Sequence, residues 1–449
     1  MLFAALIVVA VVVLHGYLWL RLVRDTTDRP RVRRAGAWVA GALALLFAVT
    51  AVGNRALPRR YEPALERVVG WPGYVWLALA GYLVLALIVL ELPAWLARGV
   101  VTARAGRGGA PRAAARNPTL APGKAAEDAR KEPATTRDGA ARDDAGRDDA
   151  GRDETTRDDA ARDASGGTAR DAGAGVDRAR RLLVARGAAI VAGLAATGVT
   201  TAGMISALGP PTIRRVRIPL RKLPRGMDGT RIALVSDVHL GALLGRAHTE
   251  RVVAAVNALD ADIVAMVGDL VDGTVGDLAP AAEPLRGLRS RRGAYFVTGN
   301  HEYFSGHEDW IEHVGELGLR VLRNARVELD GLDLAGVNDA TGGTVGDPPD
   351  YDLALGGRDP ARPVVLLAHQ PVQAHEAAKR GVDLQLSGHT HGGQLWPFHY
   401  VTRMSQPLIT GLGEVGGMPV YVTNGAGFWG PPVRVGAAPD VTLVELRAG

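Results

Sequence analysis

The chain has 449 residues, 47% of them hydrophobic, which is enough for two or three domains with a large core. It contains no cysteine, so disulfides, thiolate nucleophiles and zinc–thiolate sites are excluded, and any bound metal must have nitrogen and oxygen ligands. The formal charge of +5 comes from arginines that flank apolar segments or alternate with aspartate, so we expect it to serve topology and solvation, with no nucleic-acid partner.

Three apolar segments in the first hundred residues predict transmembrane helices. They cover residues 1–20, 35–52 and 71–96. Each is long enough to approach or span a hydrocarbon core of about 30 Å. Trp71 and Trp95 lie at opposite ends of the third segment, as interfacial anchors do. We therefore expect residues 1–100 to form a transmembrane region with three helices, and buried core helices are the alternative. A removable signal peptide is the weaker interpretation, because no charged residue precedes the first segment.

Residues 101–181 carry Arg–Asp dipeptides at every fifth position from Arg137 to Arg162. A step of five residues turns about 140° on a helix, so the charges spread around every face and no apolar stripe forms. The composition predicts a disordered Arg/Asp-rich linker, with transient helix as the alternative.

A fourth apolar segment at residues 182–208 follows Arg178, Arg180 and Arg181. It is long enough to be a fourth transmembrane helix or a signal-anchor, and the arginines before it weakly resemble a twin-arginine export signal. Arginines are slightly more numerous after the first segment than after the second. We therefore expect a multi-pass protein of the cell membrane whose C-terminal domain is extracytoplasmic.

The domain at residues 213–449 has a different pattern, in which short apolar runs alternate with helix-like segments. Examples are "RIALVSDVHL", "ADIVAMVGDLVD" and "GAYFVTGNHEYFSG", with a helical pattern at residues 248–260 between the first two. Runs without alternation indicate strands that are covered on both faces, as in layered α/β domains.

Polar residues follow five of these runs directly. They are Asp237, His239, Asp269, Asn300, His301, His369, His389 and His391. Because open α/β sheets bind ligands beyond the carboxyl ends of their strands, these side chains are expected at one edge of a sheet. Carboxylate, amide oxygen and imidazole suit divalent Mn, Fe, Zn, Co or Ni, and one carboxylate can bridge two ions. The pattern therefore predicts a site for two divalent metal ions of unknown identity.

Five motifs occur in the order D-x-H, G-D, G-N-H-E, a lone His369 and G-H-T-H. This ordered set resembles the motifs of the calcineurin-like metallophosphoesterases. The segments "GHTHGGQ" and "NGAGFWGPPVR" are similar to the bacterial membrane-associated branch of that family. The resemblance covers about residues 226–449. It implies an α/β fold, a two-sheet sandwich flanked by helices, here preceded by the α-helical transmembrane region.

The resemblance also implies a role for each site residue. Asp237, His239 and His391 would bind one ion, and Asn300, His369 and His389 the other. Asp269 would bridge the two ions. His301 would bind no metal and would lie near the leaving group. A protonated imidazole at that position stabilises a phosphate oxygen or donates a proton.

Residues outside these motifs leave alternatives open. Arg434 could bind a substrate phosphate through two hydrogen bonds or be structural, and Glu302 could orient an imidazole or lie at the surface in solvent. His248, His307, His313 and His375 are expected on helix surfaces. His399 could line a substrate pocket with Trp396 and Phe398, or simply pack.

These observations predict a membrane-anchored phosphoesterase, dependent on two metal ions, that hydrolyses a phosphodiester or pyrophosphate bond by metal-activated hydroxide. Its expected partners are the lipid bilayer and a phosphate-ester substrate, for which the membrane setting suggests a lipid-linked phosphate and lipid metabolism. A soluble nucleotide or a cell-wall phosphodiester is the alternative substrate. A metal-binding membrane sensor without catalysis is the alternative of another class.

Overall fold

The computed structural model describes residues 2–56, 66–107 and 157–449, and most of the expected linker lies outside these ranges. The chain forms two compact units. One contains Met1–Ile88 together with Ala185–Gly449, and the other is Val89–Val184. The α/β domain and the ends of the helices that contact it belong to the first unit.

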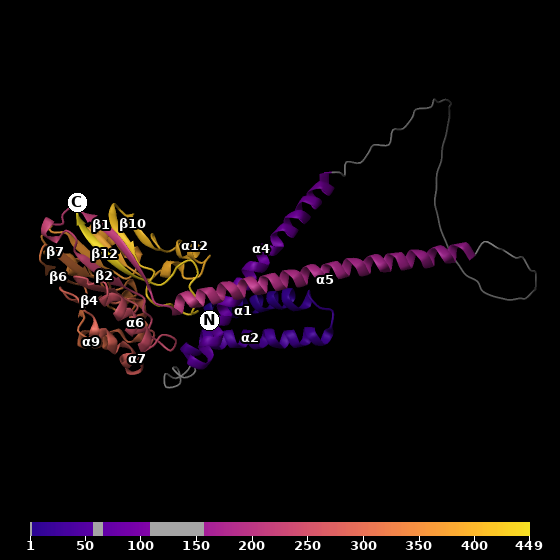
Figure 1. Ribbon diagram of the computed structural model, residues 1–449, viewed down its shortest axis with the longest axis horizontal. Helices are drawn as coiled ribbons and strands as arrows, with labels where there is room; N and C mark the ends of the chain where they lie inside the picture. Colours follow the sequence, from indigo (N-terminus) through magenta and orange to yellow (C-terminus); the bar gives the residue numbers. More distant parts are fainter. Residues whose placement is uncertain (1, 57–65, 108–156) are drawn as a thin grey trace, which may run out of the picture. The chain divides into compact units, whose positions relative to one another are not determined.

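Four long helices precede the α/β domain (Figure 1). They are α1 (Leu2–Trp19), α2 (Pro30–Ala56), α4 (Trp71–Arg107) and α5 (Arg157–Leu208), with short π-helical segments at Leu20–Arg24 and Glu66–Gly70. Three described segments are long and apolar enough to cross a membrane: Pro30–Thr50, Val68–Pro93 and Arg178–Leu208. They overlap the second, third and fourth segments expected from the sequence.

The boundaries of the expected linker differ from the prediction. Helix α4 continues to Arg107 and α5 begins at Arg157, so residues 101–107 and 157–181 are helical rather than disordered. Alanine and arginine are the commonest residues in both pieces, and both are strong helix formers. The expectation of disorder rested on the absence of an apolar stripe, with transient helix as the alternative, and a helix that continues from an apolar segment needs no new nucleus.

The α/β domain contains two mixed sheets of six strands each. The first has the order β1-β12-β2-β3-β4-β5 and the second the order β10-β11-β9-β8-β7-β6. The first consists of β1 (Thr212–Leu220), β12 (Asp440–Ala448), β2 (Arg231–Val235), β3 (Ile263–Val267), β4 (Ala294–Val297) and β5 (Arg320–Val321). The second consists of β10 (Gly411–Val415), β11 (Met418–Val422), β9 (Leu384–Ser387), β8 (Val364–Leu367), β7 (Leu332–Gly336) and β6 (Ala325–Leu329). Strand β12 pairs in parallel with β1 and antiparallel with β2, so it joins these two strands within the first sheet.

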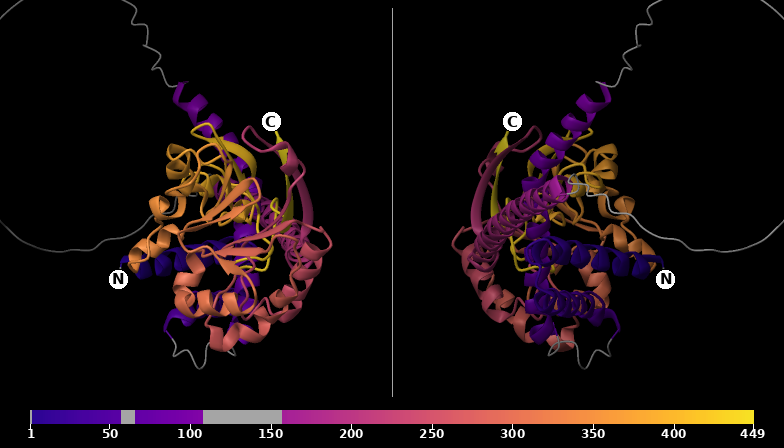
Figure 2. Two further views of the ribbon diagram at one scale, coloured as in Figure 1. Left: turned by 90° about the vertical axis from the view of Figure 1, so that its left-hand side faces the viewer. Right: turned by 90° about the vertical axis from the view of Figure 1, so that its right-hand side faces the viewer.

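The sheets pack face to face, and helices cover their outer faces (Figures 1 and 2). The core between the sheets includes Leu234, Leu334 and Leu367. On the outer face of the first sheet lie α6 (Arg246–Asn257), α7 (Val275–Ala282) and α9 (His307–Glu316), and on that of the second lie α10 (Tyr351–Leu355) and α11 (Ala374–Lys379). Since burial of one such leucine contributes about 1.5–3 kcal/mol, these layers hold the strand ends rigidly. The predicted two-sheet sandwich flanked by helices is confirmed.

Candidate dimetal centre

All eight predicted site residues lie together where strands of the two sheets end. Asp237 and His239 follow β2, Asp269 follows β3, and Asn300 and His301 begin the short helix α8 (Asn300–Ser305) after β4. His369 follows β8, and His389 and His391 follow β9. Strands β2, β3 and β4 are parallel to one another, as are β8 and β9, so each set places its carboxyl ends at one edge.

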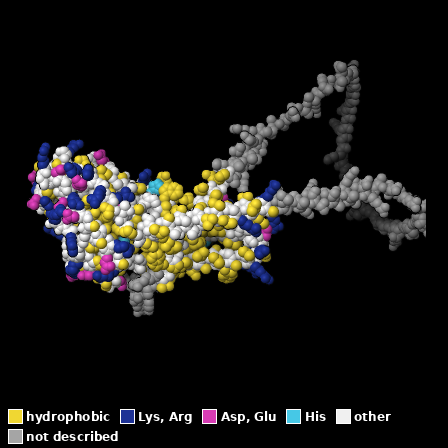
Figure 3. Space-filling model, viewed as in Figure 1, with side chains coloured by type: hydrophobic (Ala, Val, Ile, Leu, Met, Phe, Trp, Pro, Cys, Tyr) yellow, Lys and Arg dark blue, Asp and Glu magenta, His cyan; other side chains and the backbone are white. Residues whose placement is uncertain are grey.

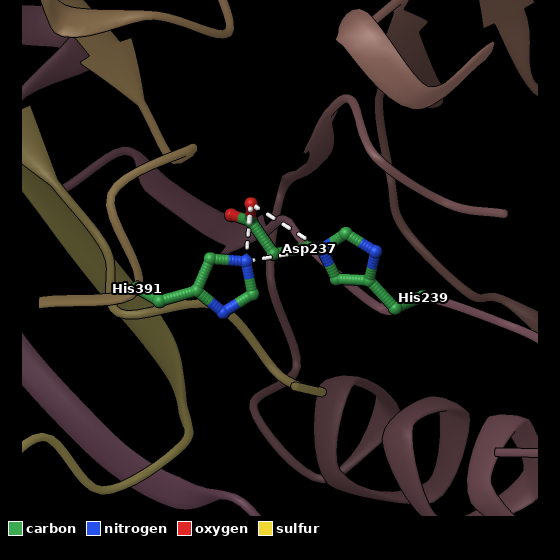
Figure 4. Close-up of side chains that lie close together, drawn as sticks. All are labelled: Asp237, His239 and His391. Atoms are coloured by element: carbon green, nitrogen blue, oxygen red, sulfur yellow. Dashed lines mark hydrogen bonds and ion pairs between the residues drawn. The ribbon is translucent and has the colours of Figure 1, made fainter. Parts of the chain in front are cut away.

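Asp237, His239 and His391 form the first cluster and point toward one another (Figure 4). His239 Nε2 and His391 Nε2 lie 3.0 Å apart, and Asp237 Oδ1 lies 3.3 Å from His391 Nε2 and 3.9 Å from His239 Nε2. All three residues are buried. Burial and the charge of Arg434 hold the pKa of His391 well below its usual value, which keeps the ring in the neutral form that binds metals.

Asp269, Asn300, His369 and His389 form the second cluster. His369 Nε2 lies 3.1 Å from both Asp269 Oδ2 and Asn300 Oδ1, and His389 Nδ1 lies 3.0 Å from the same Asn300 oxygen. The two clusters meet at Asp269, because its Oδ2 is also 3.9 Å from His239 Nε2 in the first cluster. This position between the clusters is the one a bridging carboxylate requires.

The donor set fits divalent cations. Ligands about 2.1 Å from one ion are about 3 Å from one another at right angles, and the closest contacts in both clusters have that separation. His369 Nδ1 lies 2.7 Å from the Val267 carbonyl oxygen, which can only accept, so this nitrogen carries a hydrogen. In a neutral ring, Nε2 then directs a lone pair at two oxygen acceptors. A positive charge must lie among these three atoms, as a proton or as a metal ion.

Several of these residues have a strained backbone. Asp237, His239, Asp269, His389 and His391 all have φ between 51° and 70°, the left-handed region. Such conformations cost of order 1–3 kcal/mol each for non-glycine residues, and persist where the surrounding packing enforces them. Five of the eight site residues share this conformation. The strain lowers the stability of the fold, and it accompanies side chains that point into the site.

Gly388 allows the β9 loop to approach the β2 loop closely. A Cβ at this position would collide with Ser236 Oγ and Asp237 Oδ2. The close approach lets the amide of His389 donate to both carboxylate oxygens of Asp237, at 3.1 and 3.0 Å. Gly388, directly before His389, is therefore a steric requirement of the site.

Asp272 is a site residue that the sequence analysis missed. Its Oδ1 lies 3.0 Å from His239 Nδ1 and 2.5 Å from His301 Nδ1. Since a carboxylate only accepts, His239 donates from Nδ1 and presents the lone pair of Nε2 to the first cluster, as a metal ligand must. The available signal was its position three residues after Asp269 in the same loop.

His301 is held in its protonated form by two carboxylates. Burial lowers its pKa, but the charges of Asp269 and Asp272 and the hydrogen bond that His301 donates to Asp272 outweigh that effect and raise the pKa to about 9. Its Nε2 lies 3.9 Å from Asp269 Oδ2, beside the junction of the two clusters. The ring is therefore a cationic proton donor placed next to the site.

Glu302 is fully buried and fixes backbone rather than an imidazole. Its carboxylate accepts hydrogen bonds from the amides of Gly299 at 2.6 Å, Asp269 at 3.0 Å and Leu270 at 2.7 Å. These bonds tie the loop after β3 to the first turn of α8. Neither of the two roles considered from the sequence, orienting an imidazole or lying at the surface, matches these contacts.

Arg434 lies behind His391 and is buried. Its guanidinium donates to the carbonyl oxygens of His391 at 2.8 Å, Asn424 at 2.9 Å and Gly427 at 3.0 Å. The Nη2 group is also 3.0 Å from His391 Nδ1. Because its donors are occupied by the protein, this geometry favours positioning of His391 over the predicted contact with a substrate phosphate.

The remaining histidines are only partly placed as expected. His248 was expected on a helix surface, but it is buried, since α6 turns this residue toward the core, and burial lowers its pKa to about 4. His307 and His313 are half-buried on α9, and His375 is exposed on α11 as expected. His399 begins the short helix α12 (His399–Thr402), between the exposed Phe398 and Tyr400.

Comparisons with known proteins agree with this geometry. The profile of the calcineurin-like phosphoesterases matches residues 230–393, from β2 through the last histidine of the site. A zebrafish transmembrane protein with a metallophosphoesterase domain is 38% identical over 259 residues, which are 55% of this chain and 59% of that protein. An uncharacterized metallophosphoesterase of Helicobacter pylori is 37% identical over 256 residues, 56% of this chain and 68% of that protein.

An uncharacterized metallophosphoesterase of Aquifex aeolicus is 35% identical over 240 residues, 52% of this chain and 91% of that protein. The fold and the paired clusters define a metal-dependent phosphoesterase domain. This chain belongs to the calcineurin-like phosphoesterase family. It covers less than two thirds of the zebrafish relative and of a cattle relative with the same description, and both are described as transmembrane proteins.

Proposed function

We propose that the protein is a multi-pass membrane phosphoesterase that uses two divalent metal ions to hydrolyse a phosphodiester or pyrophosphate bond. The observation that carries the proposal is the convergence of two buried clusters on Asp269, next to the protonated His301. Asp237, His239 and His391 would hold one ion, Asn300, His369 and His389 the other, and Asp269 both.

The residues of the site divide the chemical work. When bound, two such ions supply positive charge for the phosphoryl oxygens and activate a water nucleophile. His301, protonated and held by Asp272, donates a proton to the leaving oxygen or stabilises its charge. Glu302 and Arg434 keep the loops of Asp269 and His391 in place, so that the reacting groups need no reorganisation.

The proposed topology has four membrane passes with the α/β domain outside the cytoplasm. Arg186, near the start of the apolar part of α5, donates to the Thr26 carbonyl oxygen at 2.9 Å, so these two segments lie at the same end of the helices. Both segments are rich in arginine, which favours the cytoplasmic side. Helix α5 ends at Leu208 and leads directly into β1. A reporter fused after residue 449 that proves active only in the cytoplasm would overturn this orientation.

The proposed substrate is a lipid-linked phosphate ester. Two exposed aromatic side chains flank His301, Phe304 at 5.7 Å and Trp429 at 5.9 Å between ring centroids. An apolar approach to a phosphate-handling site suits a molecule that has a phosphate beside hydrocarbon, and the connection of the domain to apolar helices supports a substrate of that kind. A soluble nucleotide or cell-wall phosphodiester is the second candidate, favoured by the polar character of the clusters themselves.

Substitution of Asp269 tests the bridging role. Asp269→Asn should abolish hydrolysis of a generic aryl phosphodiester in detergent, and bound metal should fall from two ions per chain toward one, while the circular dichroism spectrum stays unchanged. Asp277→Asn, which alters an exposed carboxylate on α7, is the matched control. Full turnover by Asp269→Asn with both metals present would refute the bridge.

Substitution of His301 separates catalysis from metal binding. His301→Ala should reduce turnover by about 10²–10⁴-fold, the usual contribution of a general acid, while the metal content stays near that of the native protein. Equal loss of metal and turnover would make His301 a ligand. A native protein that binds two metals but hydrolyses no phosphomonoester, phosphodiester or pyrophosphate would instead support the sensor without catalysis.

A further inference from the structure

An exposed apolar surface lies on α12 and the residues around it, and the proposed catalysis does not use it. We call it the α12 surface and define it by Trp396, Phe398, Tyr400, Val401 and Met404. Tyr400 is 62% exposed, Phe398 58% and Met404 86%. Apolar residues exposed together on a domain mark a place where a partner or a membrane binds.

The base of the α12 surface is bonded to a membrane helix. Leu395 pairs with Val435, and the Trp396 amide donates to the Val435 carbonyl oxygen at 3.0 Å. The neighbouring Arg434 amide donates to the carbonyl oxygen of Gly203 at 2.9 Å. Gly203 lies within the candidate span Arg178–Leu208, close to its end. The α12 surface is therefore attached to α5 at the level where that helix leaves the apolar part of the membrane.

Side-chain packing supports the same attachment. Leu395, Val433 and Val435 belong to one apolar cluster with Leu18 of α1 and Ala196 of α5. Hydrophobic side chains cover the helical part of the molecule in Figure 3, whereas charged side chains gather on the α/β domain and at the opposite end of the helices. The buried packing between the helices thus continues into the α/β domain.

The charge pattern favours a lipid surface as the occupant. Residues 384–413 include no aspartate or glutamate, and Arg403 is exposed beside Met404. Tryptophan and tyrosine prefer the interfacial layer of a bilayer, and an arginine there can reach phosphate head groups. A basic, aromatic surface without acidic residues, fixed next to a spanning helix, has the composition of an interfacial membrane contact.

The same region leads to the catalytic site. The Gln394 side chain donates to the carbonyl oxygens of Trp429 at 2.8 Å and Pro431 at 3.1 Å. This bond joins the start of the α12 segment to the loop whose Trp429 ring lies beside His301. Exposed apolar side chains therefore occur both at the attachment to α5 and at the edge of the site.

We propose that the α12 surface inserts into the interfacial layer of the bilayer beside α5, so that the His301 side of the metal centre opens toward lipid head groups. The substrate is then a phosphate ester of a lipid in the same membrane. The insertion rests on the geometry above, and the substrate class rests on the proposed phosphoesterase function.

The absence of cysteine makes a direct test possible. The full chain carrying Tyr400→Cys or Met404→Cys is labelled with an environment-sensitive fluorophore and reconstituted in phosphatidylglycerol-containing vesicles. Leu353→Cys on α10, where the native side chain is 67% exposed, is the matched control. Lipids with a nitroxide near the head group should quench the first two labels at least threefold more than the control.

Equal quenching at all three positions would overturn the insertion. Self-quenching between labels at position 400 in detergent would also overturn it, because it would indicate a second copy of the chain as the occupant.

A second experiment measures activity. The triple variant Tyr400→Ser, Val401→Ser, Met404→Ser should hydrolyse a vesicle-embedded lipid phosphodiester at least tenfold more slowly, with turnover of a soluble aryl phosphodiester within twofold of native. Equal loss on both substrates would contradict the proposal.

The two proposals fail in different ways. If the native chain hydrolyses neither substrate, the phosphoesterase function fails, yet the quenching experiment still decides whether the surface inserts. If the native chain hydrolyses the soluble substrate but the labels remain unquenched, the phosphoesterase function stands and the insertion does not.

Discussion

Replacing Asp272 with asparagine should lower the pKa of His301 by about one unit in the metal-free protein. The asparagine oxygen can occupy the place of Oδ1 and keep both ring contacts, so the change removes charge rather than shape. His301 has a pKa of about 9 against the usual 6.5, which corresponds to about 3 kcal/mol of stabilisation of the folded protein. Asp269 and Asp272 both raise the pKa of His301, and we assign about 1 kcal/mol of the stabilisation to the charge of Asp272.

The sign of the pH dependence follows from the raised pKa. The stabilisation is fully present below about pH 6.5, where the unfolded histidine is also protonated, and it is lost as the pH rises through about 9. Asp272→Asn should therefore cost about 1 kcal/mol more in unfolding free energy at pH 6 than at pH 10. In the metal-loaded enzyme the same change should move the basic limb of the profile of turnover against pH about one unit lower, so that turnover falls by up to about tenfold above pH 9 and little at pH 7.

Two measurements decide the matter. Imidazole nitrogen NMR of the chelator-treated protein in detergent, with His301→Gln for assignment, gives the pKa, and urea unfolding at the two pH values gives the free energies. Asp277→Asn should change neither. If the pKa of His301 is unchanged in Asp272→Asn, the electrostatic reasoning is refuted. If the loss of unfolding free energy is the same at both pH values, Asp272 contributes through packing rather than through its charge.

Three further predictions concern the structure of the site. Gly388→Ala should lower the unfolding free energy by about 1–3 kcal/mol and abolish one metal site in metal analysis, because the new methyl group collides with Ser236 and Asp237; Gly315→Ala, on an open helical position, should not destabilise. Glu302→Gln should cost about 1–3 kcal/mol in urea unfolding, since an amide cannot accept from all three buried amides, and a neutral effect would contradict that account. Chelation should lower the melting temperature, and Mn²⁺ at a hundredfold of its Kd should restore about 2.7 kcal/mol; a melting temperature insensitive to metal would argue against a resident cation.

The strand ends could be predicted from the sequence because two independent patterns coincide there. Continuous apolar runs such as Ile263–Val267 identify strands covered on both faces, and the residue types that follow have one common chemistry. Neither pattern requires knowledge of distant contacts. For that reason the layered α/β class and the convergence of the eight side chains were accessible, whereas the arrangement in two sheets was expected only from the resemblance to the metallophosphoesterases.

The supporting residues were not accessible in the same way. Asp272 and Glu302 act on groups about thirty residues away in the sequence, and Arg434 contacts His391 across 43 positions. Such roles depend on tertiary neighbours that no local pattern encodes, so Arg434 was interpreted from its charge alone. His248 shows the converse, because a polar residue on an amphipathic helix was assumed to face solvent.

The position of β12 has a consequence for how the domain is made. Residues 440–448 lie between β1, which directly follows the last membrane helix, and β2, which leads to the first ligands. During synthesis, β1 and β2 emerge some two hundred residues before the strand that joins them. The first sheet therefore closes only after residue 448 has been synthesised, and a stop codon at position 439 would leave β1 without its neighbour.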